Sequence, residues 1–358
     1  MTALKIKERD FTIAMICFLQ GSTLFTIFFA PNLKWEAWIP ALAGIVLTLP
    51  LIWVYSALAT TFSGKSLCGI NEIVFGKAAG KIISCMYIFY FIEITVLSTD
   101  NIGSFFSDYI MPETPKAVFF IMIIVVCSFA VRSGIENIMK MGFVLLAFVT
   151  VSVVVNILLL ANKINLKNFL PVFSQEFIKY VQSVHTVVTM PFGEVVVFLM
   201  FTHITSGNIK RGYLLGFLIG ALSILIIIIR DISVLGVAMS IVSVPSYEAL
   251  RLIDISNILT RIEVLISFNM VIMSFMKISV LYCAIVEGIA EVAGTKDYKH
   301  QVWAMGVIII CFAVLGFESG YQEVEYGMSY HAFFATPFTI ILPIATLITA
   351  KLRRLKTV

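Results

Sequence analysis

The sequence predicts an all-α polytopic membrane protein with ten transmembrane helices in a single transmembrane domain, residues 1–358. Hydrophobic residues make up 60% of the 358 residues and charged residues only 13%, and the mean hydropathy is +1.01. Soluble domains do not have this balance. A membrane span needs about 20 largely apolar residues. Ten stretches meet or approach that length: 11–29, 37–59, 82–107, 117–131, 141–161, 184–204, 212–229, 262–290, 302–317 and 332–350.

The distribution of basic residues predicts that both termini lie in the cytoplasm. Lys5, Lys7 and Arg9 precede an apolar run that is too long for a signal peptide, so we expect a retained first span. With the spans alternating from there, 16 of the 25 Lys and Arg residues fall on inner segments and 8 on outer ones, which matches the positive-inside rule. An outer loop expected at 318–330 has glutamates and no base. The net charge of +4 thus reflects topology, and we expect no nucleic-acid partner.

The sixth span contains a helix break. Pro191, Gly193 and Glu194 fall within the apolar run 186–204. Proline removes a helix hydrogen bond and clashes with the preceding turn, glycine weakens the helix further, and a carboxylate at mid-depth is costly unless it is paired, hydrated or protonated. A helix broken at this depth must line a protein interior or a cavity.

The first span has a comparable interruption, and the two breaks fall at corresponding places in two halves of the chain. A polar connection at 162–182 separates five spans, 11–161, from five more, 184–352, and an odd number per half forces opposite orientations. The first span holds Gly21, Ser22 and Thr23 at its centre. Alone, these small residues would read as a helix-packing face. Together with the second break they favour a five-plus-five inverted repeat with discontinuous first and sixth spans.

Three ionisable residues fall near the middle of their spans: Glu93 in the third, Glu194 in the sixth and Lys277 in the eighth. In an inverted fold of this kind the first, third, sixth and eighth spans surround the central site. The simplest arrangement pairs Lys277 with one glutamate and leaves the other protonated or hydrated. Such a pair could be purely structural, holding two spans in register, or it could respond to a ligand or to protons.

The breaks and the charges together predict a binding site for a small zwitterion. Backbone amides exposed at the two breaks could hold a carboxylate, and freed carbonyls or an acidic side chain could hold an ammonium. Phe192 would form part of the apolar wall. The predicted ligand-binding residues are Gly21, Ser22, Thr23, Glu93, Pro191, Phe192, Gly193, Glu194 and Lys277.

The remaining candidates for chemistry predict neither a metal site nor a cofactor. The four histidines are isolated in sequence, with His185 and His331 near the outer ends of spans, and the six cysteines are scattered without a paired spacing. We also find no catalytic triad and no phosphate-binding loop, so the sequence does not predict an enzyme.

The chain resembles the B subunits of bacterial spore germinant receptors, a branch of the amino acid–polyamine–organocation superfamily with the leucine-transporter fold. The resemblance rests on the segment 190–200, which begins Met-Pro-Phe-Gly-Glu, on the segment 275–280 around Lys277, and on the ten-span plan with a basic C-terminus. It implies a protein of the spore inner membrane that senses a small nutrient, most often an amino acid, together with an A subunit and a lipoprotein C subunit.

Two functions compete at this point. A receptor subunit would bind its nutrient at the central site and pass a conformational change to its partners. A proton-coupled amino acid permease would use the same site and the same buried charges to move its substrate. A channel opened during germination is a third, weaker possibility, because the sequence contains no repeated carbonyl-filter motif.

Overall fold

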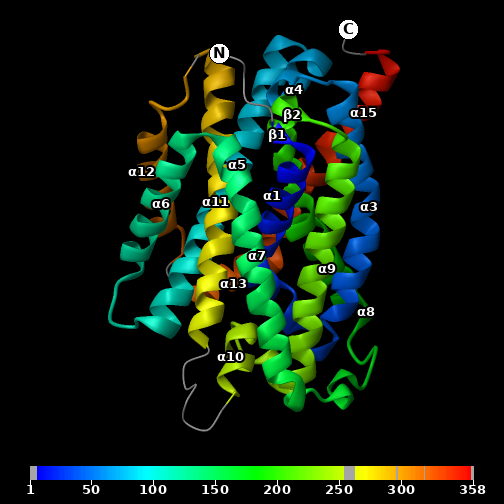
Figure 1. The fold of residues 1–358 in the computed structure, drawn as a ribbon. Coiled ribbons are helices and arrows are strands. Elements are labelled where there is room, and N and C mark those ends of the chain that lie inside the picture. Colours follow the sequence, from blue (N-terminus) through cyan, green and yellow to red (C-terminus); the bar gives the residue numbers. More distant parts are fainter. Residues whose placement is uncertain (1–5, 254–262, 296, 318, 356–358) are drawn as a thin grey trace.

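The computed structural model describes residues 6–253, 263–295, 297–317 and 319–355, which form a bundle of long helices with the first and last described residues at the same end of the bundle (Figure 1). The helices and strands are β1 (Ile6–Lys7), α1 (Glu8–Gln20), α2 (Ala30–Leu33), α3 (Trp38–Thr61), α4 (Leu67–Phe75), α5 (Lys77–Phe105), α6 (Lys116–Ser133), α7 (Ile135–Leu160), α8 (Phe177–Val187), β2 (Thr205–Ser206), α9 (Ile209–Leu235), α10 (Pro245–Arg251), α11 (Glu263–Ala293), α12 (Val302–Gly316), α13 (Gly320–Tyr326), α14 (Ala332–Thr336) and α15 (Leu342–Leu352). Short 3₁₀ or π-helical segments extend or join them at Thr23–Phe28, Lys34–Glu36, Phe106–Ile110, Ala161–Lys163, Leu166–Phe169, Val188–Phe192, Gly193–Met200, Thr202–Ile204, Gly236–Ser240, Gly327–His331 and Pro337–Ile341.

The helices follow the predicted apolar stretches in order. Within the described residues, eight helical stretches are long and apolar enough to cross a membrane, and α12 is a shorter apolar helix. The interrupted first segment precedes them. The polytopic all-α class is therefore confirmed. The exact number of crossings, and the division into repeats at 11–161 and 184–352, stay predictions.

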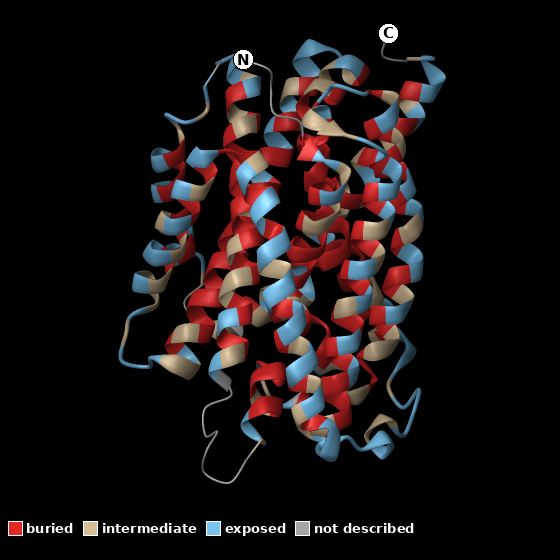
Figure 2. Ribbon diagram, in the orientation of Figure 1, coloured by how far each residue is buried: buried red, intermediate tan, exposed pale blue. Residues whose placement is uncertain are grey.

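The outer faces of the bundle are apolar, as a lipid environment requires. Figure 2 shows buried residues gathered inside the bundle and exposed residues along its outward faces. On α7 the exposed positions include Phe143, Val144 and Leu158, which are 55%, 66% and 69% exposed. Large apolar side chains presented outward at this frequency would be a liability in water, and they fit contact with lipid chains.

Tight turns between successive helices depend on two glycines. Gly76, between α4 and α5, has φ +87°, and Gly134, between α6 and α7, has φ +100°. A residue with a Cβ rarely adopts this left-handed backbone, so glycine allows each pair of helices to reverse direction with almost no loop. The start of α4 is fixed by Ser66, whose hydroxyl accepts a hydrogen bond from the Gly69 amide at 3.1 Å.

The first helix, α1, lies inside the bundle, where it packs against α9, α7 and α11. Its approach to α9 is close because α9 presents glycines at four-residue spacing. A Cβ added at Gly216 would lie 2.9 Å from the Met15 sulfur, and one added at Gly220 would lie 2.6 Å from Leu19 Cδ1. Small residues on one helix face let membrane helices pack at short range. This contact places the interrupted end of α1 at the centre of the molecule.

Two short helices occupy corresponding places in the two halves of the chain. The helix α4 connects α3 to α5 at the end of the bundle that carries the termini, and α10 follows α9 and precedes α11 at the opposite end (Figure 1). This is the placement expected for two halves of opposite orientation. The strands β1 and β2 pair in parallel, Ile6 with Thr205 and Lys7 with Ser206, and join the start of the first span to the end of the sixth.

The predicted start of the tenth span and the outer loop at 318–330 were wrong. The chain is helical from Gly320 through α13, the turn Gly327–His331 and α14, and this helical stretch continues to Leu352. The first two turns contain Glu323 and Glu325, and the charges hid the helical pattern in a hydropathy reading. Glu323 is 4% exposed and Asn101 donates a hydrogen bond to it, so this charge belongs inside the protein.

Candidate functional site

The first span is interrupted at Gly21 and Ser22, between α1 and the 3₁₀ segment Thr23–Phe28. The missing side chain of Gly21 lets its backbone lie directly on α11. A Cβ at this position would be 2.5 Å from the Met273 carbonyl oxygen and 2.7 Å from Lys277 Cβ. The interruption therefore brings the peptide groups around Ser22 against the side chain of Lys277.

The sixth span is interrupted at Met190, whose φ −141° and ψ 119° are extended rather than helical. The break follows α8 directly and precedes the segment Gly193–Met200. Pro191 supplies part of the cause because it has no N–H for a helix hydrogen bond. The Met190 side chain packs with Phe28 and Leu97, so the broken sixth span touches the first and third spans here.

The position of Gly193 is fixed by contacts with the tenth span. The Tyr55 hydroxyl donates to the Thr339 carbonyl oxygen at 2.5 Å and lies 3.4 Å from the Gly193 carbonyl oxygen. A Cβ on Gly193 would be 2.8 Å from both Thr339 Cβ and the Val188 carbonyl oxygen. Glycine is thus required by packing at this point of the chain, and the residue that follows it, Glu194, is aimed by a tightly fixed backbone.

Lys277 and Glu194 form an ion pair at the centre of the protein. The Lys277 Nζ lies 2.7 Å from Glu194 Oε2, and both side chains are fully buried. The same Nζ donates to the Ser22 hydroxyl at 2.7 Å and lies 5.4 Å from the centre of the Phe18 ring. Within the described part of the chain, Glu194 Oε1 has no hydrogen-bond partner. Two opposite charges excluded from water and joined to the interruption at Ser22 make this pair the electrostatic centre of the candidate site.

Glu93 faces a different set of partners. Its Oε1 accepts a hydrogen bond from the Tyr326 hydroxyl at 3.0 Å and lies 2.8 Å from His331 Nδ1. His331 is fully buried and lies nine residues inside the membrane-length helical stretch Gln322–Leu352, so the prediction that it lies near the outer end of a span was wrong. The prediction failed because α13 and the turn after it carry His331 inward from a start at Gly320. The sequence signal available for this site was Tyr326 and His331, which are five residues apart and follow Glu323 and Glu325.

The other predicted residues do not all converge on the ion pair. Gly21, Ser22, Glu194 and Lys277 are brought together, and Pro191 and Gly193 form the backbone of the second break. Two residues point elsewhere. Thr23 lines a separate small cavity of about 30 Å³ that also borders Asn156 and Arg230. Phe192 packs edge-to-face on Phe217 of α9, with ring centres 5.4 Å apart.

A small cavity lies between the first, third and tenth spans, nearer the α10 end of the bundle. Its volume is about 90 Å³, and Leu24, Asn101 and Glu323 contribute to its wall from the first, third and tenth spans. Sequence reasoning missed Glu323 because it assigned this residue to a loop. Among the described residues, no three His, Cys, Asp or Glu side chains are arranged to hold a metal ion.

Two Bacillus proteins are similar to this chain along most of its length. The chain is 24% identical over 357 residues to spore germination protein KB of Bacillus subtilis (strain 168), which covers 98% of this chain and 95% of that protein. It is 26% identical over 283 residues to the putative spore germination protein YfkT of the same strain, which covers 78% of this chain and 77% of that protein.

The fold is similar to that of solved transporters. Mhp1, a nucleobase-cation-symport-1 family transporter solved in a closed conformation with bromovinylhydantoin bound, matches with a TM-score of 0.58 at 12% identity, covering 96% of this chain and 80% of that one. A variant of the Eremococcus coleocola manganese transporter matches with a TM-score of 0.57 at 10% identity, covering 96% of this chain and 84% of that one. At these identities the likeness shows the fold alone, and it confirms the leucine-transporter-like class.

Residues 5–320 match the family described as spore germination protein, and this match spans most of the chain. The interrupted spans, the buried charges and the transporter fold are all consistent with it. The chain therefore belongs to the spore germination protein family of integral membrane permease-like proteins.

Proposed function

We propose that this protein is the nutrient-sensing membrane subunit of a spore germinant receptor, and that it binds a small zwitterion of the amino acid class between the first, third, sixth and eighth spans. The observation that carries the proposal is the fully buried Lys277–Glu194 pair, 2.7 Å apart, beside the interruption at Ser22. The family membership and the transporter fold support the same reading.

The chemistry of the pair explains why a zwitterion suits it. An amino acid carries one carboxylate and one ammonium, which are the partners that Lys277 and Glu194 each need. A bound zwitterion can replace the internal pair by two charge-assisted contacts, its carboxylate on Lys277 and its ammonium on Glu194. In this proposal the ligand favours a state in which the two side chains are apart.

The backbone at the first break adds to this selectivity. Ser22 already accepts a hydrogen bond from Lys277, and the peptide groups that follow α1 lie at its side. Separation of the pair would move the sixth span relative to the eighth, because Glu194 belongs to one and Lys277 to the other. We propose that this displacement, rather than passage of the ligand, is the signal that the partner subunits read.

The assembly and the location follow the same proposal. We infer that the chain acts with the receptor A subunit and the lipoprotein C subunit in the spore inner membrane, with both termini in the cytoplasm. On this assignment α4 lies at the cytoplasmic end of the bundle and α10 at the outer end. We propose no enzymatic activity for it.

The test combines direct binding with germination. Purified protein is titrated with a panel of labelled amino acids, and spores carrying Glu194→Gln or Lys277→Met are scored for germination in the nutrient that binds. Both variants should lose binding and nutrient response when they are compared with wild type at matched amounts of folded protein. The matched controls Glu113→Gln and Lys77→Met change exposed residues of the same types and should behave as wild type.

Uptake into proteoliposomes separates sensing from transport. With a pH gradient imposed across the vesicle membrane, a sensor binds the amino acid without accumulating it. Unchanged nutrient sensitivity in both Glu194→Gln and Lys277→Met spores would contradict the central-site proposal. Accumulation of the amino acid inside the vesicles would show that the protein is a transporter and not a sensor.

A further inference from the structure

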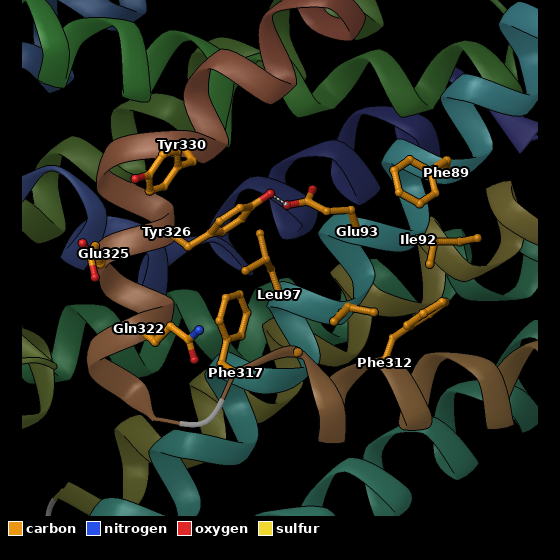
Figure 3. A pocket seen from close by; sticks show the side chains of 12 residues that line it. Phe89, Ile92, Glu93, Leu97, Phe312, Phe317, Gln322, Glu325, Tyr326 and Tyr330 are labelled. Carbon is orange, nitrogen blue, oxygen red and sulfur yellow. Dashed lines mark hydrogen bonds between the residues drawn. The ribbon is translucent and has the colours of Figure 1, made fainter.

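A second cavity lies to the side of the central ion pair, between α5 and the stretch that runs from the end of α12 through α13. Its volume is about 540 Å³, within the range of roughly 300–1,000 Å³ typical of small-molecule pockets. Figure 3 shows side chains from both walls converging on it. This cavity is separate from the Ser22, Glu194 and Lys277 cluster, and the proposed function does not use it.

The wall of the cavity is aromatic. Phe89 projects from α5, Phe312 and Phe317 come from the end of α12 and the residue beyond it, and Tyr326 and Tyr330 come from the helical stretch that opens with α13 (Figure 3). Rings of this kind offer electron-rich faces to a cation as well as apolar area to a hydrocarbon body.

The charged residues that line the cavity are all acidic. Of its 12 lining residues, all within the described part of the chain, Glu93 and Glu325 are acidic and none is Lys, Arg or His. A carboxylate entering this space would meet repulsion and find no basic partner, whereas an ammonium would meet attraction from both glutamates. The two ends of a zwitterion are therefore not both accommodated here, which distinguishes this cavity from the central site.

Glu93 lines the cavity, and one of its two carboxylate oxygens is an unused acceptor buried in the cavity wall. Its Oε1 is bonded by Tyr326 and His331, but among the described residues no donor reaches its buried Oε2. A buried carboxylate oxygen without a donor is unfavourable. A ligand ammonium at this point would supply the donor, while Tyr326 and His331 hold the carboxylate in place from the other side.

We propose that this lateral cavity is a binding site for a small organic amine with an apolar body. The ammonium donates to Glu93 Oε2, the body packs on the aromatic walls, and Glu325 at the exposed rim attracts the cation. The inference goes beyond the proposed function, since it assigns a second ligand of different charge to a second place. Because Glu93 was also among the residues predicted to bind the zwitterion, the experiment includes Gly316, a residue that the central site does not use.

Gly316 allows the cavity to be filled without disturbing the ion pair. It lines the cavity at the end of α12, and a Cβ added there would meet only Val96 Cγ1, at 3.9 Å. Gly316→Leu therefore places a branched side chain into open cavity space. Gly320→Leu is the matched control, because a Cβ at Gly320 meets no atom within 4 Å and Gly320 does not line this cavity.

The probe is 2-phenylethylamine, titrated by calorimetry into the purified full-length protein in lipid nanodiscs. Two compounds of similar shape serve as controls, 3-phenylpropionate with the opposite charge and 2-phenylethanol with none. The amine should bind and the acid should not, and the alcohol should bind about tenfold more weakly or worse because it forms no ion pair. Glu93→Gln should weaken the amine by a similar factor, with Glu113→Gln unchanged.

Gly316→Leu should abolish amine binding and leave the amino acid response of the protein intact, whereas Gly320→Leu should change neither. Equal binding of amine and alcohol, unaffected by Glu93→Gln, would mean an apolar occupant such as a lipid chain and would overturn the proposal. Amine binding that survives Gly316→Leu would also overturn it. A protein that binds the amine but gives no amino acid response would contradict only the proposal for the central site.

Discussion

Removing one member of the Lys277–Glu194 pair should destabilise the protein far more than removing both. At pH 7, neutralising an unpaired lysine costs about 5 kcal/mol and an unpaired glutamate about 4 kcal/mol, from their ordinary pKa values. These figures agree with about 3–5 kcal/mol for breaking a buried pair. Because both side chains are fully buried, water does not reduce the cost as it would at a surface.

The two single variants should differ. In Lys277→Met the carboxylate of Glu194 loses its ion-pair partner, and its Oε1 has no hydrogen-bond donor among the described residues, so the cost of protonation, about 4 kcal/mol, applies. In Glu194→Gln the ammonium keeps its bond to Ser22 and its place over the Phe18 ring, so the loss should be smaller, about 1–3 kcal/mol.

Acid should separate the variants further. Each pH unit below 7 makes protonating a lone carboxylate easier by about 1.4 kcal/mol, so Lys277→Met should regain stability relative to wild type between pH 7 and pH 6. Glu194→Gln has no carboxylate left to protonate at this position and should show no such gain. The double variant Glu194→Gln/Lys277→Met buries no charge and should be more stable than Lys277→Met.

The assay is apparent Tm in detergent, followed with a thiol-reactive dye that labels buried cysteines as they become exposed. The structure provides four such reporters: Cys17, Cys68, Cys127 and Cys283. Lys77→Met and Glu113→Gln serve as exposed controls. If the double variant loses the sum of the two single losses, and if Lys277→Met shows no gain at pH 6, the two residues are not coupled and the reasoning fails.

Three further changes probe the fold, each measured as apparent Tm. Gly21→Ala should cost about 1–3 kcal/mol because its Cβ would lie 2.5 Å from the Met273 carbonyl oxygen; wild-type stability would mean that the two helices separate easily. Tyr55→Phe should cost about 1 kcal/mol, since it deletes the 2.5 Å hydrogen bond to the Thr339 carbonyl; no change would show that this bond contributes nothing net. Gly64→Ala should cost about 1–2 kcal/mol through backbone strain alone, because Gly64 has φ +81° and open space around it; a larger loss would point to a contact not accounted for.

The fold was largely predictable because long apolar stretches allow few structures in a membrane. The two interruptions were also visible, since Pro191 and the small residues at Gly21 leave local signals that do not depend on distant contacts. The partner of Lys277 could be narrowed to two glutamates, but not chosen. That choice depends on how three helices are rotated about their axes, and hydropathy carries no information about this rotation.

The failures share one physical cause. Charged residues that are buried beside a partner look, in sequence, like charged residues in a loop. For this reason Glu323 was predicted in an outer loop and His331 near the outer end of a span, although Asn101 and Glu93 bond to them inside the bundle. The direction of the Phe192 side chain was not predictable either: its ring packs on Phe217, and sequence periodicity does not show which side a residue beside a helix break will face.

The short parallel ladder of β1 and β2 has a mechanical consequence. It ties Ile6 and Lys7 to Thr205 and Ser206, and the Glu8 carboxylate reinforces the joint by accepting from the Asn208 amide at 2.8 Å. The two interrupted spans at the centre of the molecule are therefore connected through this strand pair. We expect a tilt of the first span to move the sixth span as well, and the reverse, so that a ligand acting on one of them displaces both together.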